Sequence, residues 1–220
     1  MGRTTSDSWF ARRVMRLTRG EKRFVNDPAN AERVARIAGS LLERATLPSE
    51  PQCLEIGCGQ GAVTRLLVER YGGQVVASDY DPEQVALAQE RLADLGERVE
   101  FRVVDARAIP FDDTLFDGVF SFYVLHHIPG GWRKVVVETA RVLKPGGWFV
   151  FADMVAAPCV GRLMRRLLPR LDLLEETALH VSLNETGLHL EHCERGRGTL
   201  LGLMGHCAAV ARKVGVQALH

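Results

Sequence analysis

An apolar strand that runs directly into three closely spaced glycines limits the folds open to this chain. Residues 53–61 read CLEIGCGQG, and the helix-forming stretch AVTRLLVERY follows at once. Gly57, Gly59 and Gly61 have no Cβ, so the backbone can turn sharply out of the strand and approach a nucleoside ligand. Gly57, Gly59 and Ala62 also satisfy the GxGxxG/A pattern of dinucleotide-binding folds, so this loop alone leaves two ligand classes open.

The length of the chain allows one well-buried domain with a modest cap. The chain has 220 residues, of which 46% are hydrophobic and 25% charged, and its net charge is +1. These values are typical of a soluble globular protein and give no overall field that would attract nucleic acid. The five cysteines form no CxxC pair and no apolar run approaches the roughly 18 residues of a membrane span, so we expect a cytoplasmic protein with free thiols.

Strand and helix patterns alternate between residues 52 and 153. Short apolar runs predict buried strands at residues 54–56, 74–78, 99–104, 118–122 and 148–152. Helical patterns separate them at residues 62–71, from Pro82, and at residues 132–143, and the Pro-Gly-Gly of residues 145–147 marks a helix end. This order predicts a doubly wound parallel sheet, with ligands bound at the carboxyl ends of the strands.

Acidic residues stand at the predicted strand ends. Asp79 and Asp81 follow the second strand, where a carboxylate can accept hydrogen bonds from both ribose hydroxyls of an adenosine. Glu55 lies inside the first strand, where an ionised carboxylate is costly unless a cation or a set of N–H donors pairs with it; a ligand amine would serve. Asp105 ends the third strand and can accept from an exocyclic adenine amino group.

Five segments together resemble the class I S-adenosylmethionine-dependent methyltransferases, in particular the small-molecule group often called type 11. In chain order they are LEIGCGQG, VVASDYDP, VVDARAIPF, FDGVFSFYVLHHI and LKPGGWFVFAD, within about residues 50–153. The resemblance implies an α/β fold: a doubly wound, seven-stranded, mostly parallel sheet in the order 3-2-1-4-5-7-6, with helices on both faces and a C-terminal antiparallel hairpin.

The resemblance also implies S-adenosylmethionine as cofactor and a set of residues that bind it. The glycine loop would hold its methionine part with Glu55 in support, Asp79 would hold the ribose, and the carbonyl of Ser121 would accept from the amino group. Tyr80 would lie against the adenine, whose edge would face Asp105 and Ala106. The implied cofactor residues are Glu55, Gly57, Cys58, Gly59, Gly61, Asp79, Tyr80, Asp105, Ala106, Ser121 and Phe122.

The expected reaction is in-line methyl transfer to a small-molecule acceptor, at oxygen, nitrogen or carbon. Positioning of the acceptor supplies much of the acceleration, so we expect Tyr123 and His126 to orient it, with a dedicated base of secondary importance. The alternative for His126 and His127 is packing of the turn after the fourth strand. Methylases of nucleic-acid amino groups carry an acidic or amide residue, two prolines and an aromatic here; the chain has SFYV at residues 121–124, which disfavours nucleic acid as partner.

Three other functions stay open at this point. One is a lipid- or quinone-precursor methyltransferase at the membrane surface, one is an NAD(P)-dependent oxidoreductase, and one is a non-catalytic member that binds the cofactor alone. In the oxidoreductase Glu55 and the Asp105-Ala106 pair would have no role. The oligomeric state is left open.

The remaining segments predict a lid and a cap. Residues 1–48 are expected to form an N-terminal lid or helical segment and residues 49–220 the methyltransferase domain, with residues 154–187 as a helical cap before the terminal hairpin. Basic amphipathic stretches at residues 9–24 and 161–174 suit a lid and a cap better than membrane-surface helices. We expect helices at residues 27–44 and 159–178, the latter broken at Pro169, and hairpin strands at residues 188–194 and 203–213.

Several metal-binding residue types lie on the predicted hairpin. They are His189, His192, Cys193, His206 and Cys207. Their spacing matches no CxxC or HxxxH ligand pair, so the sequence favours ordinary strand residues over a zinc site, and no metal is expected.

Overall fold

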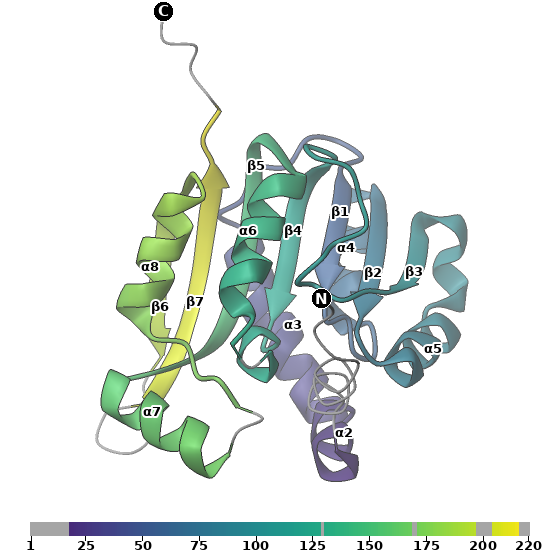
Figure 1. Cartoon of the computed structure of the whole chain (residues 1–220). Coiled ribbons are helices and arrows are strands. Elements are labelled where there is room, and N and C mark those ends of the chain that lie inside the picture. Colours follow the sequence, from purple (N-terminus) through teal and green to yellow (C-terminus); the bar gives the residue numbers. More distant parts are fainter. Residues whose placement is uncertain (1–17, 129, 169–170, 197–203, 216–220) are drawn as a thin grey trace, which may run out of the picture.

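The fold is built on a seven-stranded sheet in the order β3-β2-β1-β4-β5-β7-β6 (Figure 1). The structure is a computed structural model that describes residues 18–128, 130–168, 171–196 and 204–215. This order confirms the predicted fold class. The strands are β1 (Gln52–Ile56), β2 (Gln74–Asp79), β3 (Val99–Val103), β4 (Phe116–Phe122), β5 (Leu143–Ala156), β6 (Leu188–Gly196) and β7 (Met204–Lys213).

The strand directions place one edge of the sheet as the ligand-binding edge. β1 lies between β2 and β4 and is parallel to both, with Glu55 beside Ala77 on one side and Phe120 on the other. β3 and β5 extend the parallel part, whereas β7 pairs antiparallel with β5 and with β6. The carboxyl ends of β1, β2 and β4 therefore meet, at the place where α/β sheets bind ligands.

Helices cover both faces of the sheet. One buried layer contains side chains of α6 and α8 against Val119, Phe149 and Phe151, and the opposite layer contains side chains of α3 and α4 against Phe120 and Val150. In Figure 1 α6 lies in front of the sheet and α3 and α4 behind it. The described α-helices are α2 (Arg19–Val25), α3 (Pro28–Leu42), α4 (Ala62–Tyr71), α5 (Pro82–Arg91), α6 (Trp132–Val142), α7 (Pro158–Leu167) and α8 (Glu176–Glu185).

Local signals explain where these helices begin. Asp27 and Asp81 precede the prolines that open α3 and α5, and each carboxylate accepts a backbone N–H in the first turn, from Ala29 at 2.8 Å and from Glu83 at 3.1 Å. Proline at the first helical position loses no hydrogen bond and has the required φ. Two short 3₁₀ segments complete the described helical elements, η1 (Ala93–Arg98) and η2 (Leu125–His127).

The structure corrects some predicted boundaries. β5 begins at Leu143, which pairs with Phe116, so the Pro-Gly-Gly of residues 145–147 lies inside the strand. The strand is irregular there, since Gly146 has φ of +81° and the pairing with β4 shifts its register. The helical segment expected over residues 159–178, with a break at Pro169, is two helices, α7 and α8. The non-helical stretch between them includes residues 171–175, and α8 continues to Glu185. α3 ends at Leu42 instead of Arg44. The hairpin is confirmed as β6 and β7; its connection at residues 197–203 lies outside the described residues.

Candidate functional site

A cavity of about 460 Å³ opens where β1, β2 and β4 end. Helices α2 and α3 contribute to its opposite wall through Phe24, Val25, Asn30 and Arg33. This volume is within the usual range for small-molecule sites. Ten of the thirteen residues that the sequence analysis assigned to the site line it: Glu55, Gly57, Cys58, Gly59, Asp79, Tyr80, Ala106, Phe122, Tyr123 and His126. Gly61, Asp105 and Ser121 are not among the lining residues.

The glycine loop turns tightly around the end of β2. The backbone N–H groups of Gly57 and Cys58 both donate to the carbonyl of Ser78, at 2.7 and 2.8 Å. Gly57 has φ of +76°, and a Cβ there would lie 2.2 Å from Cγ2 of Val124. Only glycine fits this position, so the loop can pass between the end of β2 and the turn after β4.

Gly61 has a structural role. It is the N-cap of α4 in a left-handed conformation, with φ of +88°, and a Cβ there would lie 2.5 Å from Cδ1 of Leu92. The missing side chain lets α4 begin against the end of α5. Local spacing does not distinguish a glycine that faces a ligand from one that faces a helix, and the cofactor role implied for Gly61 stays a prediction.

Asp79 holds the glycine loop from the end of β2. Its Oδ2 accepts the N–H of Gly59 at 3.1 Å, and its Oδ1 accepts the N–H of Asp81 at 2.9 Å. Burial raises the pKa of Asp79, although these backbone donors oppose the change. A carboxylate offers about four lone-pair positions, so Asp79 retains acceptor capacity on its cavity side.

Glu55 is a buried carboxylate at the base of the cavity. The side chain is 3% exposed, and the hydroxyl of Thr64 donates a short hydrogen bond to its Oε2. Burial raises the pKa of Glu55 to about 7; the Thr64 hydrogen bond lowers it and the charge of Asp79 raises it further. A cationic ligand group would provide the positive partner that an ionised Glu55 needs.

Asp105 is held away from the cavity by Arg107. The Arg107 guanidinium donates to both carboxylate oxygens, with Nε at 2.9 Å from Oδ1 and Nη2 at 2.7 Å from Oδ2, and the Arg107 backbone N–H donates to Oδ1 at 3.0 Å. Partial burial opposes ionisation, but the contacts with Arg107 outweigh it and lower the pKa of Asp105. Ala106, the next residue, does line the cavity.

Ser121 lies inside β4 with no exposed surface. It stands between Ile56 of β1 and Phe151 of β5, and its hydroxyl has no hydrogen-bond partner among the described residues. Its neighbour Phe122 lines the cavity. The role implied for the Ser121 carbonyl stays a prediction.

The turn after β4 carries a buried His–Asp pair. Nδ1 of His126 lies 2.6 Å from Oδ1 of Asp153, and Oδ2 of Asp153 accepts the N–H groups of Val124 and Leu125 at 3.1 and 2.7 Å. His126 lines the cavity and is 5% exposed. Burial, with His126 beside it, lowers the pKa of His127 to about 4, so His127 is neutral at pH 7.

Tyr123 is at the centre of a group that the sequence did not reveal. It has φ of +60°, which is unusual for a residue with a side chain. Arg33 of α3 donates to the Tyr123 hydroxyl at 3.3 Å, and its guanidinium lies 4.7 Å from the ring centroid. The ring of His206 of β7 meets Tyr123 edge to face at 5.4 Å. Arg33 and His206 come from opposite ends of the chain, and no spacing signal connects them.

Helix α2, which contributes to the cavity wall, is held in place by two ion pairs and a hydrogen bond. Lys22 forms ion pairs with Asp81 and Glu83 at the start of α5, at 2.7 and 2.5 Å. The Gln60 amide donates to the carbonyl of Val25 at 3.2 Å. This is the described part of the predicted lid; residues 9–17 of the basic amphipathic stretch lie outside the described residues.

The metal-binding residue types of the hairpin separate into different surroundings. His206 faces the cavity, and His192 lies 2.8 Å from Oε1 of Glu194. Cys193 and Cys207 are 3.2 Å apart, sulfur to sulfur. They lie in the layer that contains α8.

The sheet order, together with a glycine loop held by an acid at the end of β2, defines a class I methyltransferase fold. The family model described as "Methyltransferase domain" matches residues 54–151. Residues 54–151 thus match a methyltransferase domain, which agrees with the predicted family and with S-adenosylmethionine as its cofactor.

Two curated relatives show the range of acceptors among similar sequences. The chain is 33% identical over 129 residues to the 27-O-demethylrifamycin SV methyltransferase of Amycolatopsis mediterranei, covering 58% of this chain and 47% of the relative. It is 40% identical over 110 residues to the 2-methyl-6-phytyl-1,4-hydroquinone methyltransferase of Synechocystis, covering 49% of this chain and 33% of the relative. The chain thus spans between a third and a half of the length of these two relatives.

Solved structures share the fold across nearly the whole chain. The geranyl diphosphate C-methyltransferase of Streptomyces coelicolor, solved with Mg²⁺, geranyl diphosphate and S-adenosyl-L-homocysteine, has a TM-score of 0.74 and 15% identity, covering 96% of this chain and 98% of that one. The cyclase SpnF has a TM-score of 0.71 and 22% identity, covering 82% and 81%. The latter shows that this fold does not by itself specify methyl transfer.

Proposed function

We propose that the chain transfers the methyl group of S-adenosylmethionine to a small-molecule acceptor that has an apolar body. The observation that carries this proposal is the cavity itself. It joins the glycine loop and Asp79 at one end to Tyr123, His126, Arg33 and His206 at the other. The residues proposed for the cofactor and those proposed for the acceptor therefore line the same cavity, as group transfer between the two requires.

The cofactor end fits S-adenosylmethionine. The loop around Gly57 leaves no room for a side chain, and Asp79 faces the cavity with acceptor capacity for ribose hydroxyls. Glu55 supplies a buried negative charge that a cationic group can neutralise. When bound, the cofactor supplies an already activated methyl group on a sulfonium, so the chain needs to contribute orientation and exclusion of water.

The acceptor end is built to hold one orientation. Tyr123 is fixed by the Arg33 hydrogen bond and by the edge contact of His206. His126 is fixed through Nδ1 by Asp153, which is itself held by backbone N–H groups. Side chains supported in this way keep their position when an acceptor binds, and that lowers the entropic part of the barrier.

His126 can hold a proton without being required for every acceptor. With Nδ1 directed at Asp153, Nε2 is the nitrogen left to accept a proton from a hydroxyl or a protonated amine. An acceptor that attacks from carbon or from a neutral amine needs no proton removed before attack. Orientation is therefore the main contribution that we assign to Tyr123 and His126.

The lining favours an acceptor with an apolar body. The apolar side chains that line the cavity include Phe24, Val25, Val34, Ile128 and Met154. The curated relatives are named for acceptors of this kind, a demethylrifamycin and a phytyl hydroquinone among them. A polyketide, isoprenoid or aromatic hydroxy compound is the class that we propose for this chain.

Calorimetry and a product assay test the proposal together. We expect S-adenosylmethionine and S-adenosylhomocysteine to bind and NAD⁺ not to bind. S-adenosylmethionine should be converted to S-adenosylhomocysteine only when an acceptor of this class is added. Tighter binding of NAD⁺ would overturn the cofactor assignment. A product of unchanged mass from a bound acceptor would instead indicate non-methylating catalysis, as the fold of SpnF permits.

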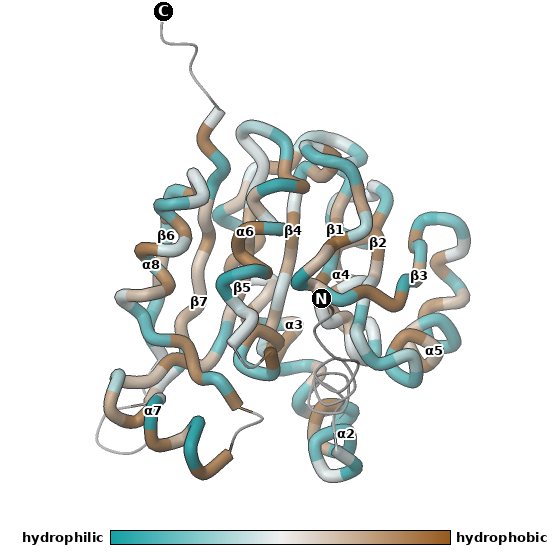
Figure 2. The backbone as a smooth tube through the Cα atoms, viewed as in Figure 1, coloured by the Kyte–Doolittle hydropathy of each residue, from teal (hydrophilic) through white to brown (hydrophobic). Residues whose placement is uncertain are grey.

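A membrane-surface version of this function has one observation in its favour. Helix α7 exposes Leu163 and Leu167 by 52% and 61%, beside Arg162 and Arg166 (Figure 2 shows hydrophobic and hydrophilic residues side by side along this helix). A basic helix with an exposed apolar side suits the surface of an anionic bilayer. Among the described residues no helix is long and apolar enough to cross one.

Vesicle flotation distinguishes the two versions. Binding to anionic vesicles that is lost on replacing Leu163 and Leu167 by serine, and that falls with salt, would favour collection of the acceptor from a membrane. Equal binding of the wild type and the double variant would show that α7 is a solvated cap.

A further inference from the structure

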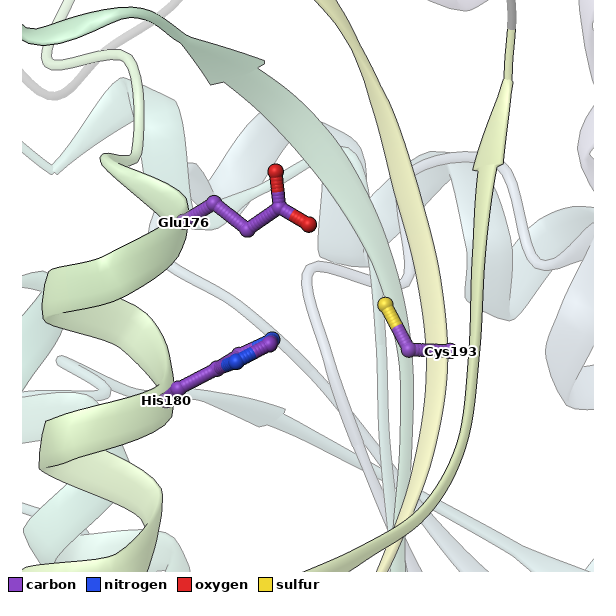
Figure 3. Close-up of side chains that lie close together, drawn as sticks. All are labelled: Glu176, His180 and Cys193. Carbon is purple, nitrogen blue, oxygen red and sulfur yellow. The ribbon is translucent and has the colours of Figure 1, made fainter.

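A second cluster of ligand-type side chains lies away from the cavity, between α8 and the hairpin. Glu176 and His180 project from α8 toward Cys193 of β6 (Figure 3). One donor atom from each residue, a carboxylate oxygen, an imidazole nitrogen and the thiol sulfur, lies within 4.8 Å of the others. Neither the domain family nor the proposed methyl transfer assigns a role to these three residues.

The fold fixes the position of this cluster. Glu176 and His180 are four residues apart, so they lie one turn apart on the same face of α8. Leu179 and Leu183 of the same helix are buried against the sheet, which sets the rotation of α8. Cys193 lies on the edge strand β6 and faces the same layer.

A fourth donor stands next to Cys193. The thiol of Cys207 on β7 lies 3.2 Å from the thiol of Cys193, and Cys207 is buried. The Cys207 thiol and the nearby His180 imidazole lower the pKa of Cys193 to about 6, against the opposing effect of partial burial. Metals bind the thiolate form of cysteine, so zinc binding at Cys193 would release the thiol proton.

His180 provides an independent sign that a ligand is missing from the cluster. Its Nε2 is buried and has no hydrogen-bond partner among the described residues. A buried polar atom without a partner destabilises the folded state, so such atoms are rare in folded proteins. A metal ion placed between the imidazole, the carboxylate and the thiolate would satisfy this nitrogen.

We propose that Glu176, His180 and Cys193 bind a zinc ion, with Cys207 as the fourth ligand. Thiolate and imidazole donors select zinc over magnesium or calcium, which prefer all-oxygen sites. Zinc bonds of about 2.0–2.3 Å in a tetrahedron separate ligand atoms by roughly 3.3–3.8 Å. The donors of Glu176, His180 and Cys193 therefore have to approach by up to about 1.5 Å, which side-chain torsions can supply because all three residues are partly exposed. Cys207 lies outside this group of three and would have to move toward Glu176 and His180 as well.

Arg195 is the charged neighbour of the site. Its Nη1 lies 3.5 Å from Oε2 of Glu176, which leaves Oε1 of the same carboxylate for the metal. Four protein ligands would close the coordination shell, as in structural zinc sites. The ion would tie α8 to both strands of the hairpin, and we assign it no part in methyl transfer.

Zinc binding is measured on the full chain, without a polyhistidine tag and in a phosphine reductant that keeps Cys193 and Cys207 reduced. We expect one zinc ion per chain and an increase in melting temperature on adding zinc. Cobalt in place of zinc should give a thiolate-to-metal charge-transfer absorption. Cys193→Ser and His180→Gln should each weaken zinc binding by roughly tenfold or more, at least the loss seen when an outer partner of a bound metal is removed.

Matched variants control for surface thiols and imidazoles. Cys159 is an exposed cysteine on α7 and His189 an exposed histidine on β6, so Cys159→Ser and His189→Gln should leave zinc binding unchanged. Equal affinity in Cys193→Ser and Cys159→Ser would overturn the site. So would the absence of zinc binding by a folded, reduced wild-type chain.

The thiols of Cys193 and Cys207 are also close enough to form a disulfide, and measurements with and without the reductant distinguish a disulfide from a zinc site. If the charge-transfer absorption appears with reductant and is lost after oxidation, the two thiols are ligands that oxidation removes, and the proposal stands. If zinc changes neither the melting temperature nor the absorption while oxidation alone raises the melting temperature, the pair is a disulfide pair and the zinc site is refuted.

Discussion

Replacing Glu55 by glutamine should change folding stability and cofactor affinity in opposite directions. Glu55 is buried, and its pKa is raised to about 7 from an ordinary value near 4.5. The native state therefore binds the proton more tightly than the unfolded state does. The stability that neutral Glu55 confers is fully present below about pH 4.5 and is lost as the pH rises through 7.

The size of the effect follows from these two pKa values. A rise from 4.5 to about 7 corresponds to at most about 3 kcal/mol of folding free energy, and about 2 kcal/mol of that is lost between pH 5.5 and pH 8. Glutamine keeps an oxygen that can accept the Thr64 hydroxyl and carries no charge. Glu55→Gln should thus stabilise the chain at pH 8 by about 1–3 kcal/mol without its cofactor.

Urea unfolding at pH 5.5 and pH 8 measures this difference, with calorimetry of S-adenosylmethionine alongside. The variant should gain stability at pH 8 and lose cofactor affinity by roughly tenfold or more, since it lacks the carboxylate that faces a cationic ligand. Glu97→Gln, an exposed carboxylate on η1, should change neither quantity. Equal stability of Glu55→Gln and wild type at pH 8 would refute the reasoning.

Three further predictions concern the cavity. Asp79→Asn should weaken S-adenosylmethionine binding by roughly ten- to a hundredfold, the value of one charged hydrogen bond, whereas Asp94→Asn at an exposed position should leave it unchanged. Calorimetry measures both affinities, and unchanged affinity in Asp79→Asn would exclude a ribose contact. His126→Ala should lower turnover by less than about a hundredfold; a larger loss at intact cofactor affinity, with a missing acidic limb in the pH profile, would show that the acceptor needs a base. Lys22→Ala removes the α2 ion pairs and should reduce turnover while changing unfolding by under about 1 kcal/mol; unaltered kinetics would disprove a lid function.

The parts of the site that depend on neighbouring residues could be predicted from the sequence. The strand before Gly57, the helix after Gly61 and the acid at Asp79 follow from local patterns, and parallel strands bring their carboxyl ends together. The sheet order was available only through resemblance, because a pattern of strands and helices does not fix which strands pair.

The parts that depend on tertiary placement could not be predicted. Arg33 and His206 reach Tyr123 from α3 and β7, and nothing in either segment marks them. The capture of Asp105 by Arg107 had a local signal, since an aspartate commonly accepts the backbone N–H two residues on. On the hairpin, ligand spacing along one segment predicted no metal site, and it could not show that Glu176 and His180 of a separate helix lie close to Cys193.

Strand β7 contributes adjacent residues to the cavity and to the proposed zinc site. His206 stands opposite Met154 and lines the cavity, while Cys207 stands opposite Asp153, the residue that holds His126, and faces the other layer. A shift of β7 on zinc binding would thus displace His206, which contacts Tyr123, and also Asp153, which holds His126. Any free energy that zinc adds to acceptor binding must equally be added by the acceptor to zinc binding, so titrating zinc with and without acceptor measures how far this strand couples the two sites.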